Sequence, residues 1–386
     1  MTGSGTVTRT ALVLLCVSLL LGASLSCWAE GEESSFAYDV GPRLLGVDAG
    51  IGYRGIRLLP NVDTTIWAYL GGGYEWLTYY RDPSGALVAP RELAPGGPLA
   101  GDPGFKRIEV AWRMGIDQGL AWNERTKRNL VEAFAFYRGR VDFNEIKQGQ
   151  LLYDSTIPDR TGLLLNSIIA GLAYDDVLAN THHKTYSGTS AELSAEWGPR
   201  FFLNTFKGDS DFVRFNATFR WFLPLYDQKP DLPVNFFSVY LGERLAVDYA
   251  LGLSAPVPLY IRQTFGGRGD QVIGLGKAVR GVDEGSLDTN LKAVNSLEVR
   301  ANLPAFVNPD VVPGFLFFWD LGYYNQVGES GFTGAAGAGV VSSAGGGIFL
   351  DFLDFARGAA YMTRRLTGVN ADGSVVNFMV EFGLHF

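Results

Sequence analysis

The last segment of the chain, residues 375–386, alternates between apolar and other side chains. Counting back from the terminal Phe386, the apolar set contains Leu384, Phe382, Val380, Phe378 and Val376. Successive side chains of a strand point to opposite faces, so this strand has one apolar and one largely polar face. Such a segment is typical of the closing strand of a bacterial outer-membrane β-barrel, which meets lipid outside and water or polar groups inside. The final strand of a soluble β-sandwich would show the same alternation.

The start of the chain has the pattern of a secretory signal peptide. Arg9 precedes the apolar run Ala11–Leu21, and small residues follow up to Ala29. This run is too short for a membrane-spanning helix, so we expect residues 1–29 to be a leader that is cleaved after Ala29. Cys27 leaves one alternative, a lipoprotein in which this thiol is acylated, although residues 24–26 make a poor lipobox.

Composition supports a barrel and limits the possible partners. The chain has 49 glycines, 26 phenylalanines, 17 tyrosines and 8 tryptophans, and only 19% of its residues are charged. Barrels use glycine where strands bend and aromatic residues at the lipid interfaces. The net charge of −8 disfavours a nucleic-acid partner. Both cysteines, Cys16 and Cys27, lie in the expected leader, so we predict no disulfide in the fold.

Several internal segments repeat the alternation of the last strand, most clearly 108–117 and 213–223. A third run, 237–249, keeps it except at Glu243, which predicts a bulge or a change of register there. Other predicted strands are 44–56, 64–80 (one kinked strand or two), 129–141, 163–174, 189–197 and 257–264. At about ten residues per strand plus connections, the mature chain would hold about sixteen strands. We therefore predict an all-β, transmembrane antiparallel barrel over residues 43–386, preceded by a short periplasmic segment, residues 30–42.

An ordered set of motifs in residues 257–386 resembles the barrel of the BamA and TamA superfamily of outer-membrane surface antigens. Val279-Arg280-Gly281 is similar to the tip of the sixth loop of that family, which folds into the barrel. Residues 295–300 resemble its twelfth strand, which carries an interior glutamate, here Glu298. Residues 318–322 match its F-x-D-x-G motif, with Phe318, Asp320 and Gly322. Each motif is weak alone, but their order over a third of the chain is specific.

The resemblance implies a contact that locks the inward-folded loop. Alternation places Asp320 and Glu298 on the inner faces of neighbouring strands, where two carboxylates need a cation. The family supplies that cation from the loop, as Arg280, followed by Gly281. A planar guanidinium can bridge two carboxylates by several charge-assisted hydrogen bonds. A solvated loop with both acids facing water would be the simpler arrangement.

The resemblance also implies a function and partners. Members of this family insert or translocate protein or lipid at the outer membrane, and they are themselves inserted by the barrel-assembly machinery. Phe378, Phe382 and Phe386 would then belong to the assembly signal and to the strand that closes the barrel against the first strand. Only about a dozen residues separate Ala29 from the first expected strand, too few for the periplasmic POTRA domains of most members. We expect outer-membrane lipid and a polypeptide or lipid client as partners.

Other residues suggest weaker alternatives. Asp175, Asp176, His182 and His183 could ligate a metal, but their loose spacing favours a polar loop, and we expect no metal or cofactor. Arg268-Gly269-Asp270 suggests an adhesin and reads first as a turn. We find no nucleophile elbow, P-loop or zinc-protease motif, so we do not expect an enzyme. A passive channel or solute transporter is the main alternative function, with a lumen lined by Arg113, Arg214 and Arg220.

Overall fold

The chain folds into one long antiparallel β-sheet. The structure, a computed structural model, describes residues 35–43, 46–82, 88, 101–180, 185–204, 210–228, 237–268, 278–283, 287–305, 311–325, 338–352, 356–367 and 374–384. The leader predicted over residues 1–29 lies outside these residues.

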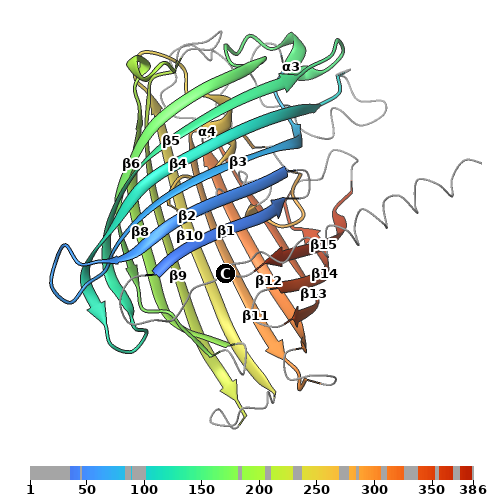
Figure 1. Ribbon diagram of the computed structural model, residues 1–386. Coiled ribbons are helices and arrows are strands. Elements are labelled where there is room, and N and C mark those ends of the chain that lie inside the picture. The colour runs from blue at the N-terminus through green and yellow to red at the C-terminus, as the bar shows by residue number, and fades with distance from the viewer. Residues whose placement is uncertain are drawn as a thin grey trace, which may run out of the picture.

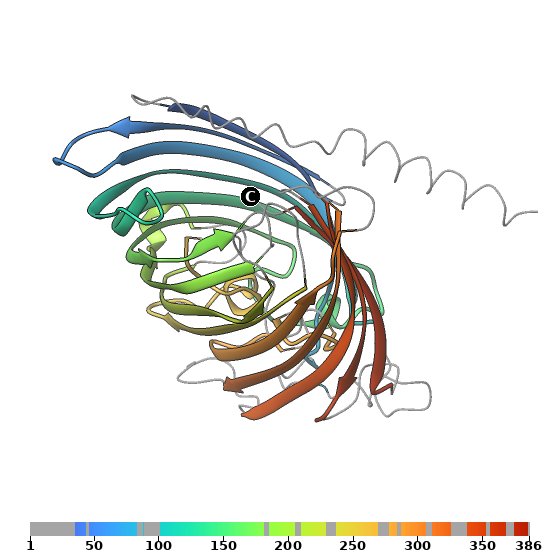
Figure 2. The same cartoon turned by 90° about the horizontal axis from the view of Figure 1, so that it is seen from below.

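Neighbours along the sequence are neighbours in the sheet, except that the short β7 (Leu178–Asn180) lies off the main path and pairs with β8. The strands of the main path are β1 (Ser35–Arg43), β2 (Gly46–Ile56), β3 (Thr64–Thr78), β4 (Gly104–Asn123), β5 (Arg128–Glu145), β6 (Gly162–Asp175), β8 (Thr185–Gly198), β9 (Phe212–Asp227), β10 (Ser238–Gly252), β11 (Leu291–Asn302), β12 (Val311–Asn325), β13 (Gly339–Phe352), β14 (Ala356–Arg365) and β15 (Val376–Leu384). Figures 1 and 2 show this sheet curling round an interior.

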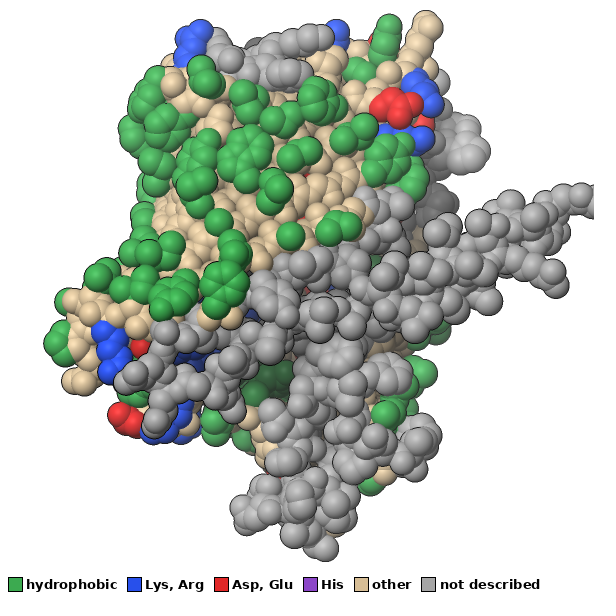
Figure 3. Space-filling model, viewed as in Figure 1, with side chains coloured by type: hydrophobic (Ala, Val, Ile, Leu, Met, Phe, Trp, Pro, Cys, Tyr) green, Lys and Arg blue, Asp and Glu red, His purple; other side chains and the backbone are tan. Residues whose placement is uncertain are grey.

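The predicted alternation sorts side chains between the two faces of the sheet. In β12, Phe315, Phe317 and Trp319 are 43%, 63% and 43% exposed on the outer face. Their neighbours Leu316, Phe318 and Asp320 are buried on the inner face. Figure 3 shows the same division on the face that it draws, where apolar side chains cover the outside and the Lys, Arg, Asp and Glu side chains lie near the ends of the strands. This is the pattern of a barrel with an apolar exterior and a polar interior.

The main path contains fourteen strands among the described residues, compared with the predicted sixteen. The strands are nine to twenty residues long, and most exceed the ten assumed from sequence, so fewer of them use the same length of chain. The boundary predicted between residues 42 and 43 falls inside β1. All nine residues of β1 pair with β2, so the sheet begins within the segment that we expected to precede it.

Two other predicted elements differ in the structure. Residues 257–264, expected as a strand, instead contain the short helix α4 (Leu259–Gln263), because Pro258 supplies a fixed φ of −56° at its N-cap and has no N–H for a ladder. Residues 64–80, predicted as one kinked strand or two, contain one strand, because Gly71-Gly72-Gly73 lies within the uninterrupted β3. The register shift of β10 falls between Val239 and Tyr240, not at Glu243.

The other short helices, α3 (Leu151–Asp154) and the 3₁₀ turn η1 (Arg200–Phe202), lie in connections between strands. None of the helices in the described parts of the chain is long and apolar enough to span a membrane. The order runs from β1 to β15, and no ladder joins these two edge strands among the described residues.

Candidate functional site

The candidate site is built by the connection between β10 and β11, residues 253–290, which we call the β10–β11 loop. In fourteen strands it is the fifth connection on its side, and it corresponds to the loop predicted as the sixth. All five residues of α4 are buried. The part of the loop that contains α4 therefore lies against the inner wall instead of projecting from the strand ends (Figure 1).

Helix α4 is held by polar contacts at both of its ends. The backbone N–H of Leu259 donates to Asp159 Oδ2 at 2.7 Å, from the β5–β6 connection. Gln263 Nε2 donates to the carbonyl of Thr78 at 3.0 Å, at the end of β3. Between these contacts the Tyr260 ring lies 3.8 Å from the Arg140 guanidinium carbon, which is a cation–π geometry. The helix is thus anchored to the part of the wall formed by β3, β5 and the β5–β6 connection.

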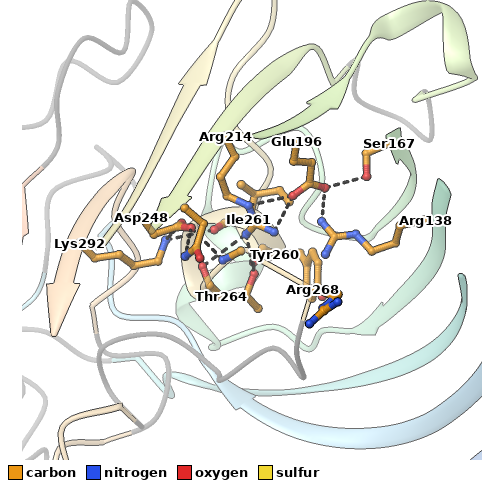
Figure 4. Close-up of polar contacts among 12 residues, drawn as sticks. Arg138, Ser167, Glu196, Arg214, Asp248, Tyr260, Ile261, Thr264, Arg268 and Lys292 are labelled. Atoms are coloured by element: carbon orange, nitrogen blue, oxygen red, sulfur yellow. Dashed lines mark hydrogen bonds and ion pairs between the residues drawn. The ribbon is translucent and has the colours of Figure 1, made fainter. Parts of the chain in front are cut away.

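A buried carboxylate, Glu196 on β8, joins four strands beside α4. It accepts from Arg214 Nε of β9 at 2.9 Å and from Ser167 Oγ of β6 at 2.7 Å, and it pairs with Arg138 of β5. Arg214 Nη1 also donates to Thr264 Oγ1 at 3.1 Å, directly after α4. Figure 4 shows these side chains converging on one another. The network ties the loop to the wall and satisfies the charges that burial would otherwise leave unpaired.

A second buried pair fixes the loop to the strands that flank it. Lys292 Nζ of β11 lies 3.0 Å from Asp248 Oδ2 of β10, and both side chains are 0% exposed. Asp248 Oδ1 accepts from the Gly266 N–H at 2.8 Å and from Asn216 Nδ2 of β9 at 3.2 Å. One carboxylate therefore connects three strands with the loop.

Further along the loop, Arg280 contacts both carboxylates that the sequence places on the inner face. Its Nε and Nη2 donate to Asp320 Oδ2 and Oδ1 at 2.9 and 2.8 Å, and its Nη1 donates to Glu298 Oε2 at 2.5 Å. The guanidinium carbon lies 3.6 Å from the centroid of the Phe318 ring. Burial alone would lower the pKa of Arg280, but the hydrogen bonds and charges of Asp320 and Glu298 outweigh it and raise that pKa. We call this contact the Arg280 clasp.

Gly281 allows the chain to turn immediately after the clasp. Its φ of +81° is a left-handed conformation that favours glycine, and a Cβ there would overlap the Thr363 side chain of β14. Its carbonyl accepts from Asn377 Nδ2 of β15 at 2.9 Å. The next residue, Val282, packs with Phe265 and Val294 in a buried apolar cluster. The loop tip therefore reaches the last two strands of the sheet.

A segment of the chain that contains the Arg280 clasp matches a known family. Residues 162–353, from β6 into the end of β13, match the model of the Omp85 superfamily domain and include Arg280, Glu298 and Asp320. The chain belongs to the Omp85 superfamily. No curated protein matches it.

Solved structures share the fold of this Omp85 protein. BamA from Haemophilus ducreyi lacking POTRA domains 1-3 aligns with a TM-score of 0.51 and 12% identity, over 91% of this chain and 64% of that chain. CdiB from Acinetobacter baumannii also aligns with a TM-score of 0.51 and 12% identity, over 91% and 53%. At such identities the likeness concerns the fold alone, and this chain spans less than two thirds of either relative.

The remaining predicted residues belong to the Arg280 clasp and to the closing strand. Gly322 is buried on the same inner face as Asp320. Phe378 is 69% exposed on the outer face of β15. Phe386 and the side chain of Phe382 lie outside the described residues, so the structure leaves their predicted part in barrel closure as a prediction.

The other candidates fall into separate places of the Omp85 fold. Arg268 is turned inward, where its Nη1 donates to Glu132 Oε2 at 2.6 Å, while Gly269 and Asp270 lie outside the described residues. Asp175 and Asp176 pair with Arg128 and Arg125, and His182 and His183 are not described. The described residues contain no group of three His, Cys, Asp or Glu side chains that could hold a metal ion.

The glutamate-centred network and the Asp248–Lys292 pair were not predicted. Arg214 was predicted to line the lumen, and it does lie inside, but as a buried partner of Glu196. Arg113 also lies inside, with its guanidinium carbon 4.8 Å from the Tyr69 ring. The inward positions of Glu196, Asp248 and Lys292 could be read from strand alternation. Their pairing could not, because it depends on the path of the loop.

Proposed function

We propose that this protein resides in the bacterial outer membrane and assists the insertion or translocation of polypeptide or lipid there, along its edge strands instead of through a central pore. The observation that carries the proposal is the position of the β10–β11 loop inside the barrel. The apolar outer wall supports residence in a membrane, because polar groups are concentrated inside and at the strand ends (Figure 3).

The loop argues against an open pore because it crosses the interior. Its contacts reach Thr78 at the end of β3, Arg140 on β5, Arg214 on β9 and Asp320 on β12. Beside α4 the structure leaves a cavity of about 350 Å³, lined by residues including Arg107, Arg113, Tyr260 and Gln263. A chamber of this size suits water and small solutes, but a polypeptide or a lipid needs another route.

The edge strands provide such a route. Within the described residues no ladder joins β1 and β15, and each of these strands pairs there with one neighbour, β2 and β14. An exposed sheet edge recruits an extended segment through backbone hydrogen bonds, which is how a client strand would join the wall. The clasp lies close to this edge in the fold, because Gly281 accepts a hydrogen bond from Asn377 on β15.

Conductance in planar bilayers separates this function from a passive channel. We expect small and irregular currents from the intact protein, and large, steady currents after residues 257–268 are replaced by a flexible Gly/Ser linker. The control variant carries a Gly/Ser replacement of the exposed residues 57–61 in the β2–β3 connection, and it should retain small currents. Large, steady currents from the intact protein would instead establish the channel.

An insertion assay tests the proposal directly. Vesicles containing the protein should accelerate the folding of a urea-unfolded eight-stranded outer-membrane protein, measured by its heat-modifiable mobility on gels. Arg280→Ala should remove much of this acceleration, and Arg280→Lys, which keeps the charge without the planar fork, should retain part of it. Acceleration no greater than in empty vesicles would exclude an insertase for this client class. Dithionite quenching of labelled lipids then tests a lipid client separately.

A further inference from the structure

Glu243 departs from the alternation of β10, and the structure shows that this departure is real. Its neighbours at even positions, Ala246 and Asp248, are 0% exposed inside, whereas Leu245 and Val247 are 41% and 36% exposed outside. Glu243 shares the parity of the outward residues, and the register shift lies at 239/240. Its register partners, Trp221 on β9 and Leu297 on β11, share the outward parity of their own strands. The carboxylate therefore lies on the apolar outer wall.

This position sets Glu243 apart from the other acids of the sheet. Among strand residues with described side chains, and away from strand ends, it is the one carboxylate on the outer face. The inner face instead holds Glu109, Asp142, Glu196, Asp248, Glu298 and Asp320, each with a basic partner. Within the described residues the one hydrogen-bond partner of Glu243 is Asn295 of β11, whose Nδ2 donates to Oε1 at 2.8 Å.

Lipid solvates this pair poorly. A charged residue on the lipid face of a barrel destabilises it most near the middle of the strand, and Glu243 lies five residues into the fifteen-residue β10. The contact with Asn295 uses one carboxylate oxygen and one amide hydrogen. The other oxygen of Glu243 and the second amide hydrogen of Asn295 have no partner among the described residues. The wall thus presents an acceptor and a donor side by side.

An acceptor and a donor on one surface are self-complementary. If a second copy approaches about a twofold axis, each Glu243 meets the amide of Asn295 of the partner subunit, and both remaining groups are satisfied. The row beyond Leu245 and Asn295 contains Ala217, Val247 and Ala293, and its two alanines let the walls come close there. Apolar area does not favour pairing within lipid, because lipid covers it equally well, so the polar pair supplies the preference.

We infer that the outer face of β9, β10 and β11 around Glu243 and Asn295 is an interface at which two copies of this chain pair within the membrane. The inference does not depend on the proposed function, because none of these residues contacts the β10–β11 loop or the edge strands in the described structure. The Glu243–Asn295 pair would bind a second copy from the outer face, whereas the Arg280 clasp holds the loop of one copy in the interior.

Cysteine cross-linking in vesicles tests the interface. Leu245→Cys places a thiol beside Glu243, and the matched control Leu172→Cys places one on the outer face of β6, where the leucine is 51% exposed. A short bis-maleimide should give a covalent dimer with Leu245→Cys and little with Leu172→Cys. Protein without an introduced cysteine measures the background from Cys16 and Cys27.

Removal of the polar pair gives the second arm. In the Leu245→Cys background, Glu243→Leu with Asn295→Leu should abolish most of the cross-linked dimer. In micelles the dimer dissociation constant, from sedimentation equilibrium, should rise about tenfold to a hundredfold for two lost membrane hydrogen bonds. Heat-modifiable mobility verifies that each variant folds, and the outward substitutions leave the interior untouched.

Three outcomes would overturn the inference. They are equal cross-linking at Leu245→Cys and Leu172→Cys, a dimer that persists undiminished without Glu243 and Asn295, and a cross-linked product in native membranes whose mass corresponds to a different protein. The last would assign the same wall to another membrane-embedded partner.

Discussion

The inner and outer faces of β10 and β11 carry the same kinds of residues in different surroundings. On the inside, Asp248 and Lys292 pair at 3.0 Å, and Glu298 accepts from Arg280 of the loop. On the outside, the one hydrogen-bond partner of Glu243 within the described residues is the neutral Asn295. The inner carboxylates stabilise the fold because the loop and neighbouring strands supply cations. The outer carboxylate of Glu243 contacts a neutral amide instead of a cation, so we assign it a part in binding a second copy.

Among the changes that test this comparison, breaking the Arg280 clasp should lower the stability of the protein most. Arg280→Ala leaves Asp320, which is 0% exposed, without its cation, and we expect the free energy of unfolding to fall by about 3–5 kcal/mol. Urea unfolding in micelles, followed by tryptophan fluorescence, measures this loss. Arg280→Lys should lose less because it retains the charge. Equal stability of Arg280→Ala and the wild type would show that the inner carboxylates are solvated instead of clasped.

Lys292→Met should cost somewhat less. It leaves Asp248 with its hydrogen bonds from Asn216 and Gly266, so we expect a loss of about 2–3 kcal/mol in the same unfolding experiment. Adding Asp248→Asn, which removes the orphaned charge, should recover part of the loss. If the stability lost in the double variant equalled the sum of the losses of Lys292→Met and Asp248→Asn alone, the two residues would not be coupled.

Gly281→Ala should have a moderate effect that is confined to the loop tip. The left-handed φ and the overlap with Thr363 should together destabilise the protein by about 1–3 kcal/mol. The matched control is Gly242→Ala in β10, where a Cβ would meet Phe222 at an ordinary 3.5 Å. Limited proteolysis of the loop reports the change. Indistinguishable cleavage of the two variants would contradict the role of Gly281.

Glu243→Leu should have the smallest effect and the opposite sign. Replacing a carboxylate on the lipid face by an apolar side chain should stabilise the monomer by about 1 kcal/mol. Unfolding of dilute protein in micelles, where dimers are sparse, measures it against Asp248→Leu, which should destabilise. A loss of stability in Glu243→Leu would mean that both faces use their carboxylates in the same structural way.

The sequence was most informative where a motif placed charges on known faces. Alternation alone puts Asp320 and Glu298 inside, and the order of motifs indicates Arg280 as their partner, which is the contact that the structure contains. Helix α4 was not foreseen, since Val257–Thr264 has the composition of a strand and its path is set by contacts with distant walls. The four-strand network of Glu196 was likewise hidden, because residues of separate strands converge there (Figure 4).

The sequence by itself determined which face of each strand is apolar, because side-chain alternation is a local property with a period of two residues. It thereby predicted a sheet with one apolar and one polar face, as a barrel requires, and singled out Glu243 as an exception. Only the tertiary structure decided that this exception faces outward, since a bulge at 243 would have turned the side chain inward. It also decided which charges meet, as in Arg81 and Asp288, which are 207 residues apart in the chain and 2.8 Å apart in space. Such pairs depend on register and on the entry of the loop, which no local pattern encodes.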